Sequence, residues 1–415
     1  MDVEVVSIGD ELLLGYTIDT NAAHFAREAA ALGIRVVRRA TVGDGADEIA
    51  AGVREALERT GAVITSGGLG PTADDLTKPS VAAIFGRAMY RDESIIASLK
   101  ARWKARGWPG ELPIANHAQA MIPEGATILE NRHGSAPGIW LEDQRGRWVA
   151  MLPGVPREFR GMAKDTLLPR LLARGAGGTV VRSRTLRTTG IAESAVADAL
   201  AEHAKDPLGV SLAYLPGWEG VDLRLTMRNV TADVADAKLA AAAAVLRERV
   251  GKFVYGEDDS DLCVLVLEEL RARGMRIAVA ESCTGGMLGM RLTAIPGSSD
   301  VVLGGVIAYD NAVKISLLGV SHARLEAQGA VSEETARAMA SGVRTRLMAD
   351  VGVSITGVAG PGGGTPEKPV GTFCVAVDVR GEVRSLRTAG VGDRHEIRQR
   401  ATQAALNLVR KALAG

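Results

Sequence analysis

The first 170 residues alternate between short apolar segments and longer segments with helical spacing. The apolar segments 3–9, 34–42 and 62–68 predict strands, and the amphipathic segments 19–33 and 47–61 predict helices. Strands that alternate with helices in this way form parallel sheets covered by helices. We therefore expect an α/β domain built on a parallel sheet.

Polar and glycine-rich loops follow each of these predicted strands. They are Gly9-Asp10-Glu11, Gly43-Asp44 and SGGLGPTADDLT at 66–77. In open α/β sheets, ligands bind beyond the carboxyl ends of the strands. Three such loops on one sheet edge therefore predict a ligand site there.

The loop at 66–77 combines several groups that suit a phosphate ester. Its glycine amides could surround a phosphate, Thr72 could add a hydroxyl, and Asp74 and Asp75 could hold Mg²⁺ against it. A glycine loop and an Asp pair also occur where a turn simply caps the next helix. The residues alone leave both interpretations open.

The pattern is interrupted at RGAGG, residues 174–178, where glycines end a helical segment and predict a linker. A small β-α-β-β-α module is expected beyond it, with strands at 179–190, 210–215 and 221–230 and helices at 193–204 and 232–251. This module has no paired carboxylates, glycine loop or metal-ligand spacing. We interpret it as a spacer or a dimerisation element.

A third segment begins near residue 257 and has α/β character again. Its strand MRIAVA leads into AESCTGG, residues 280–286, and a helical pattern follows, so Ser282 lies where a strand gives way to a helix. Amides at a helix N-terminus could hold an oxyanion or a phosphate, and a nearby base would make Ser282 nucleophilic. Ser282 or Thr284 could instead cap the helix, and the Cys283 thiol could be the nucleophile.

Candidate partners for Ser282 follow in the same segment. Tyr309 ends a predicted strand at 301–308, and Lys314 lies in the first turn of the next helix. The helix dipole and burial would lower the pKa of Lys314, so its neutral amine could deprotonate Ser282. The alternative is an ordinary exposed lysine. Arg394, at the start of the last helix, could meet a phosphate.

Composition excludes several classes of protein. The 415 residues carry 49 basic and 49 acidic side chains with no basic run, which argues against nucleic-acid binding. No apolar stretch approaches the ~20 residues that span a bilayer, so we expect a cytoplasmic protein. The 3 cysteines and 6 histidines lack the spacing of disulfides or zinc sites.

The C-terminal segment closely resembles the nicotinamide-nucleotide deamidase family called PncC, which is also the C-terminal domain of CinA proteins. The motifs AESCTGG, AYDNAVK, GAVSEETA, SITGVAGPGGG, KPVGT and GDRHEIRQ occur in the order of that family between residues 260 and 411. The resemblance implies that Ser282 is the nucleophile and that Lys314 and Tyr309 assist proton transfer. It also implies a substrate-binding set of Thr284, Gly285, Gly286, Thr356, Gly357, Gly360 and Arg394, with Arg398 as an alternative phosphate ligand.

The N-terminal segment resembles the first domain of the CinA family, which is similar to molybdopterin-binding proteins. IGDELLLG, DTN, Gly43-Asp44, TSGGLGPTADDLT and LPGVPREF carry the resemblance. It implies metal-dependent cleavage of ADP-ribose to AMP and ribose phosphate, with Asp44 and Asp75 as catalytic residues. The implied substrate ligands are Asn21, Gly67, Gly68, Gly70, Pro71 and Thr72, and the implied metal ligands are Asp10, Glu11, Asp74 and Asp75. The segments 115–131 and 134–140 would form loop-rich walls of this pocket.

The sequence therefore predicts two parallel-sheet α/β domains, 1–174 and 257–415, joined by a small α+β module at 175–256. We expect a homodimer that acts on nicotinamide mononucleotide and ADP-ribose. The N-terminal domain is expected to use a divalent metal, most simply Mg²⁺, and the C-terminal domain is expected to need no cofactor. In one alternative only one end is catalytic and the first domain binds a nucleotide or pterin. In another the chain is a non-catalytic partner in DNA uptake, which the balanced charge disfavours.

Overall fold

The computed structural model describes residues 1–175, 178–201 and 209–414. The chain forms two compact units. One contains Met1–Arg182 and Met227–Asp236, and the other contains Ser183–Thr226 and Ala237–Gly415. The division into three domains at 174/175 and 256/257 stays a prediction. Residues 176–177 of the predicted linker lie outside the described residues.

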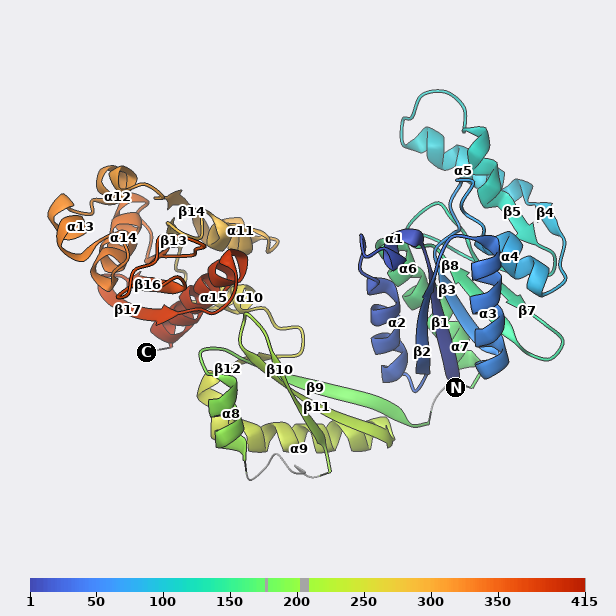
Figure 1. Ribbon diagram of the computed structural model, residues 1–415, viewed down its shortest axis with the longest axis horizontal. Helices are drawn as coiled ribbons and strands as arrows, with labels where there is room; N and C mark the ends of the chain where they lie inside the picture. The colour runs from blue at the N-terminus through green and yellow to red at the C-terminus, as the bar shows by residue number, and fades with distance from the viewer. Residues whose placement is uncertain (176–177, 202–208, 415) are drawn as a thin grey trace. The chain divides into compact units, whose positions relative to one another are not determined.

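The first unit is built on a six-stranded sheet in the order β2-β1-β3-β8-β7-β6 (Figure 1). The strands β1, β2, β3 and β8 are parallel, whereas β7 pairs antiparallel with β8, and β6 pairs antiparallel with β7. The expected parallel sheet is therefore extended by an antiparallel edge, as is common in large α/β sheets. The strand bounds are β1 Asp2–Ile8, β2 Arg35–Val42, β3 Ala62–Ser66, β6 Thr127–Leu129, β7 Gly138–Glu142 and β8 Trp148–Leu152.

Helices cover both faces of this sheet, and the alternation along β1 shows why. Val3 and Val5 join one apolar cluster with Phe25 of α2 (Thr20–Ala31). Val6 and Ile8 join another with Ile49 of α3 (Ala46–Thr60). Figure 1 shows α2 and α3 on opposite sides of the strands. Both faces of β1 are therefore buried, as expected for a strand inside a parallel sheet that is covered by helices.

Apart from α5, the remaining elements up to residue 173 are short. The segments 115–131 and 134–140, expected to be loop-rich, contain a 3₁₀ helix, η1, two whole strands, β5 and β6, and the first residues of β7. These elements are too short to show a clear hydrophobic period in the sequence. The other bounds are α1 Asp10–Leu13, α4 Thr77–Ile84, β4 Met89–Arg91, α5 Glu93–Ala105, η1 Ile114–Ala120, β5 Met121–Pro123, α6 Pro156–Met162, the π turn Ala163–Leu167 and α7 Leu168–Ala173.

The middle segment forms a four-stranded sheet in the order β10-β11-β9-β12. The predicted β-α-β-β-α succession is present, and β12 follows it as a further strand that the sequence analysis did not predict. The predicted helix 193–204 is described only to residue 201, and residues 202–204 lie outside the described residues. The bounds are β9 Val180–Thr188, α8 Glu193–Leu200, β10 Ser211–Pro216, β11 Val221–Val230, α9 Ala232–Val250, η3 Gly251–Phe253 and β12 Val254–Glu257.

The C-terminal segment has a five-stranded sheet in the order β14-β13-β15-β16-β17. The strands β14, β13 and β15 are parallel, and β16 and β17 extend the sheet antiparallel. The elements are α10 Leu262–Ala272, β13 Ile277–Glu281, α11 Met287–Thr293, η4 Ser298–Asp300, β14 Val302–Ile307, α12 Asn311–Leu318, α13 His322–Gln328, α14 Glu333–Arg346, β15 Val351–Gly357, β16 Thr372–Val379, β17 Glu382–Ala389 and α15 Arg394–Leu413.

The two faces of β13 pack against different helices. Ile277 and Val279 lie in a cluster with α10 and α15, while Ala278 and Ala280 lie in a cluster with Met339 of α14. This double burial fixes the register of β13, because a shift by one residue would exchange its large and small faces. The end of β13, and with it Ser282, is therefore held firmly. Within the described residues no helix is long and apolar enough to cross a membrane.

Candidate functional site

A tight turn, Ser282–Gly286, joins β13 to α11. Gly285 and Gly286 have positive φ angles of 56° and 95°, which glycine adopts without steric cost. Gly286 is the N-cap of α11, so no side chain caps the helix from that position. The hypothesis that Ser282 or Thr284 is the N-cap is therefore wrong, because the helix begins after both residues.

The first amides of α11 bind a buried carboxylate instead. Glu281, which is 1% exposed, accepts hydrogen bonds from the backbone N–H groups of Gly286 (3.1 Å), Leu288 (3.0 Å) and Gly289 (2.8 Å). A carboxylate at this position is stabilised by both the unpaired donors and the helix dipole. The sequence predicted that amides at this helix N-terminus could hold an oxyanion or a phosphate. Three of them bind Glu281 instead, a role that the sequence analysis did not identify.

Ser282 lies at the wall of a cavity of about 290 Å³. Its amide donates to the carbonyl of Ile355 on β15 at 2.9 Å, which anchors the turn to the neighbouring strand. The cavity brings together most of the residues predicted for this end of the chain. They are Ser282, Tyr309, Lys314, Thr356, Gly357, Gly360 and Arg394.

Lys314 is 1% exposed, although it is a lysine. Its Nζ donates to the carbonyls of Ala308 (2.9 Å) and Tyr309 (3.1 Å). Burial lowers the pKa of Lys314 below the ordinary value, as the sequence predicted, although the nearby Asp310 carboxylate opposes the shift. No hydrogen bond joins Lys314 Nζ to Ser282 Oγ in the described part of the chain. Both residues nevertheless line the same cavity.

Cys283 follows Ser282 and lies in the same cavity wall. Its side chain is buried, and this burial raises the pKa of the thiol to about 12. A thiol with that pKa is almost entirely protonated at neutral pH, and the thiolate is the nucleophilic form. The environment therefore favours Ser282 over Cys283.

Two arginines approach this site from α15 in different ways. Arg394 lies in the cavity wall, donating to the carbonyl of Gly360 (2.6 Å) and to the hydroxyl of Tyr309 (3.1 Å). Arg398 donates to the carbonyl of Thr284 at 2.6 Å and does not line the cavity. Arg398 thus supports the turn. Thr284, Gly285 and Gly286 form that turn and also do not line the cavity.

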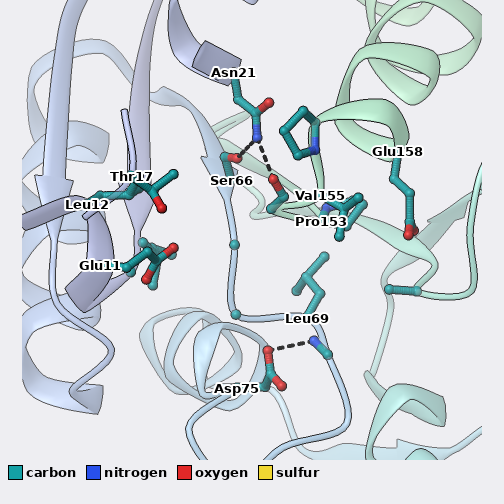
Figure 2. A pocket seen from close by; sticks show the side chains of 18 of the residues that line it. Glu11, Leu12, Thr17, Asn21, Ser66, Leu69, Asp75, Pro153, Val155 and Glu158 are labelled. Carbon is teal, nitrogen blue, oxygen red and sulfur yellow. Dashed lines mark hydrogen bonds between the residues drawn. The ribbon is translucent and has the colours of Figure 1, made fainter. Parts of the chain in front are cut away.

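A larger pocket, about 570 Å³, lies at the carboxyl ends of the parallel strands in the first unit. Figure 2 shows its walls, with Glu11 and Thr17 on one side and Pro153, Val155 and Glu158 on the other. Asn21 links two walls, since its Nδ2 donates to Ser66 Oγ (3.0 Å) and to the carbonyl of Gly154 (2.7 Å). Of the residues predicted here, Glu11, Asn21, Asp44, Gly67, Gly68, Gly70, Pro71, Asp74 and Asp75 line the pocket, while Asp10 and Thr72 do not.

Asp75 organises the glycine loop of this pocket. Its carboxylate accepts the amides of Gly70 (2.6 Å) and Thr72 (2.8 Å) and the hydroxyl of Thr72, and Figure 2 draws the bond to Gly70. Gly67 has a φ of 115°, and a Cβ there would lie 2.3 Å from the carbonyl oxygen of Ile8. The loop therefore requires glycine at 67 and a carboxylate at 75 to keep its shape.

Asp10 and Asp44 hold two neighbouring loops together. The amide of Asp10 donates to the Asp44 carboxylate (3.0 Å), and the amide of Asp44 donates to the Asp10 carboxylate (3.3 Å). The described residues contain no group of three or more His, Cys, Asp or Glu side chains arranged to hold a metal ion. Several of the predicted metal ligands thus have structural partners within the protein.

Known proteins resemble the chain along its whole length. Residues 4–173 match the family described as "Probable molybdopterin binding domain", residues 183–256 match "Damage-inducible protein CinA KH domain" and residues 259–413 match "CinA C-terminal domain". A CinA-like protein of Gemmatimonas aurantiaca is 63% identical over all of this chain and 97% of the relative's length. The chain belongs to the CinA family.

A second relative and a solved structure are also similar to the chain. A CinA-like protein of Gloeobacter violaceus is 42% identical over 99% of this chain and 96% of its own length. The crystal structure of a competence/damage inducible protein from Agrobacterium tumefaciens is 40% identical, covers 37% of this chain and 94% of its own, and has a TM-score of 0.36.

The structure of this CinA chain also reveals a buried lysine that the sequence analysis missed. Lys78 in α4 is 3% exposed and donates from Nζ to the carbonyl of Ala118 at 2.6 Å. Burial lowers the pKa of Lys78 to about 8, and the Asp75 carboxylate opposes this shift. It follows directly after ADDLT in the sequence, and only its proximity to the loop distinguishes it from a surface lysine.

Proposed function

We propose that this CinA chain is a hydrolase of pyridine nucleotides, and that its C-terminal end converts nicotinamide mononucleotide to nicotinate mononucleotide and ammonia. The observation that carries the proposal is the cavity shared by Ser282, the buried Lys314 and Arg394. A hydroxyl, a buried amine and a guanidinium are the groups needed to attack an amide and hold a nucleotide phosphate. The family resemblance at these positions supports the same assignment.

In the proposed reaction Ser282 Oγ attacks the carboxamide carbon of the substrate, and its proton passes to the neutral Lys314 amine. The C–N bond then breaks, and the protonated Lys314 returns the proton to the departing nitrogen, which leaves as ammonia. Water hydrolyses the resulting ester and frees Ser282. The amide of Cys283, which has no backbone or carboxylate acceptor among the described residues, is available to the oxyanion.

Arg394 would bind the substrate's phosphate. A guanidinium carries five N–H donors, so its contacts with Gly360 and Tyr309 leave donors free for a second partner. Thr356 shapes the same wall, because its buried hydroxyl donates to the carbonyl of Ala330 at 2.8 Å. This reaction needs only groups of the chain itself, and we propose that it proceeds without a cofactor.

For the N-terminal end we propose hydrolysis of a diphosphate, the cleavage of ADP-ribose to AMP and ribose 5-phosphate. The Asp75 carboxylate occupies the loop amides of Gly70 and Thr72 and keeps the loop in shape, while the amides of Gly68 and Leu69, which have no acceptor among the described residues, would face the diphosphate. A magnesium ion would neutralise the phosphate charge. Mg²⁺ commonly takes one or two carboxylates and completes its shell with water and phosphate oxygens. One or two of the pocket-lining carboxylates Glu11, Asp44 and Asp74 would supply such a partial set, since no three acidic side chains of the described residues are arranged around one metal position.

The decisive experiment incubates the purified chain separately with nicotinamide mononucleotide and with ADP-ribose plus Mg²⁺, and identifies the products by mass. The expected products are nicotinate mononucleotide without added metal, and AMP with ribose 5-phosphate only with metal. Deamidation alone would support the alternative in which the first domain binds a nucleotide or pterin without turnover. If neither nicotinate mononucleotide nor AMP is formed, the proposal is overturned.

A further inference from the structure

A second cavity, about 160 Å³, adjoins the glycine-loop pocket of the first unit. It is lined by residues of α5, of the segment 106–112 and of η1. Pro71, Gln119 and Ser135 line both cavities. A ligand whose phosphates lie against the glycine loop can therefore extend into the second cavity past these residues. Nothing in the proposed diphosphate chemistry uses this space.

The walls of the second cavity suit a flat aromatic group. Trp103 and Trp108 meet edge to face with ring centroids 4.5 Å apart, and the Arg106 guanidinium lies 5.0 Å from the Trp108 ring centroid. Trp108 is 47% exposed, so much of its side chain remains accessible. Apolar side chains, Leu99 and Leu112, close the inner wall. Cavities of about 150 Å³ accept a benzene-sized ring.

Polar groups stand where this cavity meets the larger one. Asn116 Nδ2 donates to Gln119 Oε1 at 3.3 Å, and both side chains line the cavity. Amide side chains can both donate to and accept from the edge of a heteroaromatic ring. Aromatic faces, guanidinium planes and amides are the groups that proteins use to stack and hydrogen-bond nucleobases.

We propose that this cavity binds the purine base of the nucleotide whose phosphates lie in the glycine-loop pocket. The inference rests on the proposed cleavage of ADP-ribose, for which it assigns the adenine to the wall formed by Trp103, Trp108 and Arg106. The diphosphate then lies between the base and the ribose phosphate, across Pro71 and Gln119. A substrate without a base would lose this contact and keep the contacts of its phosphates.

The test measures binding to the full chain by calorimetry, with AMP and ribose 5-phosphate as ligands and Trp108→Ala as the variant. We expect the variant to weaken AMP binding and to raise KM for ADP-ribose by about tenfold, the factor that corresponds to the loss of one stacking contact. Ribose 5-phosphate binding and kcat should change less than twofold. Trp108→Phe, which keeps an aromatic face, should retain most of the AMP affinity.

Tyr90→Ala is the matched control, because Tyr90 is a partly exposed aromatic residue of the same unit outside both cavities. Unchanged AMP binding by Trp108→Ala, or equal weakening of ribose 5-phosphate, would overturn the inference. So would binding of neopterin in place of AMP. Trp108-dependent AMP binding without ADP-ribose cleavage would uphold the base site and refute the proposed reaction. ADP-ribose cleavage that Trp108→Ala leaves unchanged would uphold the proposed reaction and refute the base site.

Discussion

At the scale of single residues, burial gives neighbouring side chains opposite chemistry. The Cys283 thiol and the Lys314 amine are both shielded from water in the same cavity wall. Burial disfavours the charged form of each group, so it raises the pKa of the thiol and lowers the pKa of the amine. The thiol thus stays protonated and unreactive, while the amine approaches the neutral form that can accept a proton.

The first prediction separates the two candidate nucleophiles. Cys283→Ala should keep most of the deamidase activity, since its protonated thiol contributes no attacking anion. Ser282→Ala should lose nearly all activity, by a factor of about 10³ or more, as other serine nucleophiles do. Ammonia release from nicotinamide mononucleotide is the measurement. The reverse pattern would transfer the nucleophile to Cys283.

The second prediction concerns the base. Lys314→Arg keeps the positive charge but cannot release its proton at a working pH, so deamidation should fall by about 10² or more. In the unmutated chain the rate should rise with pH as Lys314 loses its proton. Because burial lowers this pKa, the rise should occur below the reference value of 10.5. The pH profile of kcat/KM measures it. An active Lys314→Arg variant with an unshifted acid limb would leave Tyr309 as the candidate base.

At the scale of elements, carboxylates shape the two turns that carry the chemistry. Glu281 binds the first amides of α11, and Asp75 binds the amides of the glycine loop. In each case the chain uses a carboxylate to satisfy backbone donors that a tight turn leaves without partners. The active groups are therefore held by residues that do not themselves need to react.

The third prediction tests the turn before α11. In the unmutated chain three backbone N–H groups donate to the two carboxylate oxygens of Glu281. Glu281→Gln replaces one of these oxygens with an NH2 donor, so at least one of the hydrogen bonds is lost. Hydrogen bonds to a charged group contribute about 1.5–3 kcal/mol each. We expect a lower thermal midpoint and at least about a tenfold loss of deamidation. Glu268→Gln, an exposed change on α10, is the control and should alter neither. Full activity in Glu281→Gln would show that the turn does not depend on this carboxylate.

The fourth prediction distinguishes the two carboxylates of the first unit. Asp75→Asn should raise KM for ADP-ribose, because the loop loses one of the two carboxylate oxygens that accept its amides, without changing the metal concentration that gives half-maximal rate. Asp44→Asn should instead raise that metal concentration, because an amide is a poor ligand for Mg²⁺. Asp47→Asn, an exposed change in the first turn of α3, is the control. A changed metal requirement in Asp75→Asn would make Asp75 a metal ligand.

At the scale of the whole molecule, the first compact unit contains the six-stranded sheet with its pocket, and the second contains the five-stranded sheet with its cavity. The glycine-loop pocket is lined only by residues of the first unit, and the Ser282 cavity only by residues of the second. Each proposed reaction thus has its full set of side chains within one unit. The net charge of zero gives the chain no general attraction for polyanions.

The fifth prediction follows from this separation. Ser282→Ala should leave ADP-ribose cleavage within about twofold of the unmutated rate, and Asp44→Asn should leave deamidation equally unaffected, since sites that share no residues or partners act independently. Both rates are measured on the same preparations. In parallel, a gel shift at about 150 mM salt should show no DNA binding. A salt-sensitive complex with DNA would favour the alternative of a partner in DNA uptake.

The sequence by itself determined the parallel cores, the turn at Ser282 and the loops at the sheet edge, because these depend on local periodicity and on glycine at fixed positions. Arg394 at the start of α15 was predictable for the same reason. Tertiary structure alone decided the rest. The antiparallel edges, β12, the role of Glu281 and the burial of Lys78 depend on contacts between segments distant in sequence or on how a turn folds back on itself, and no local pattern records those contacts.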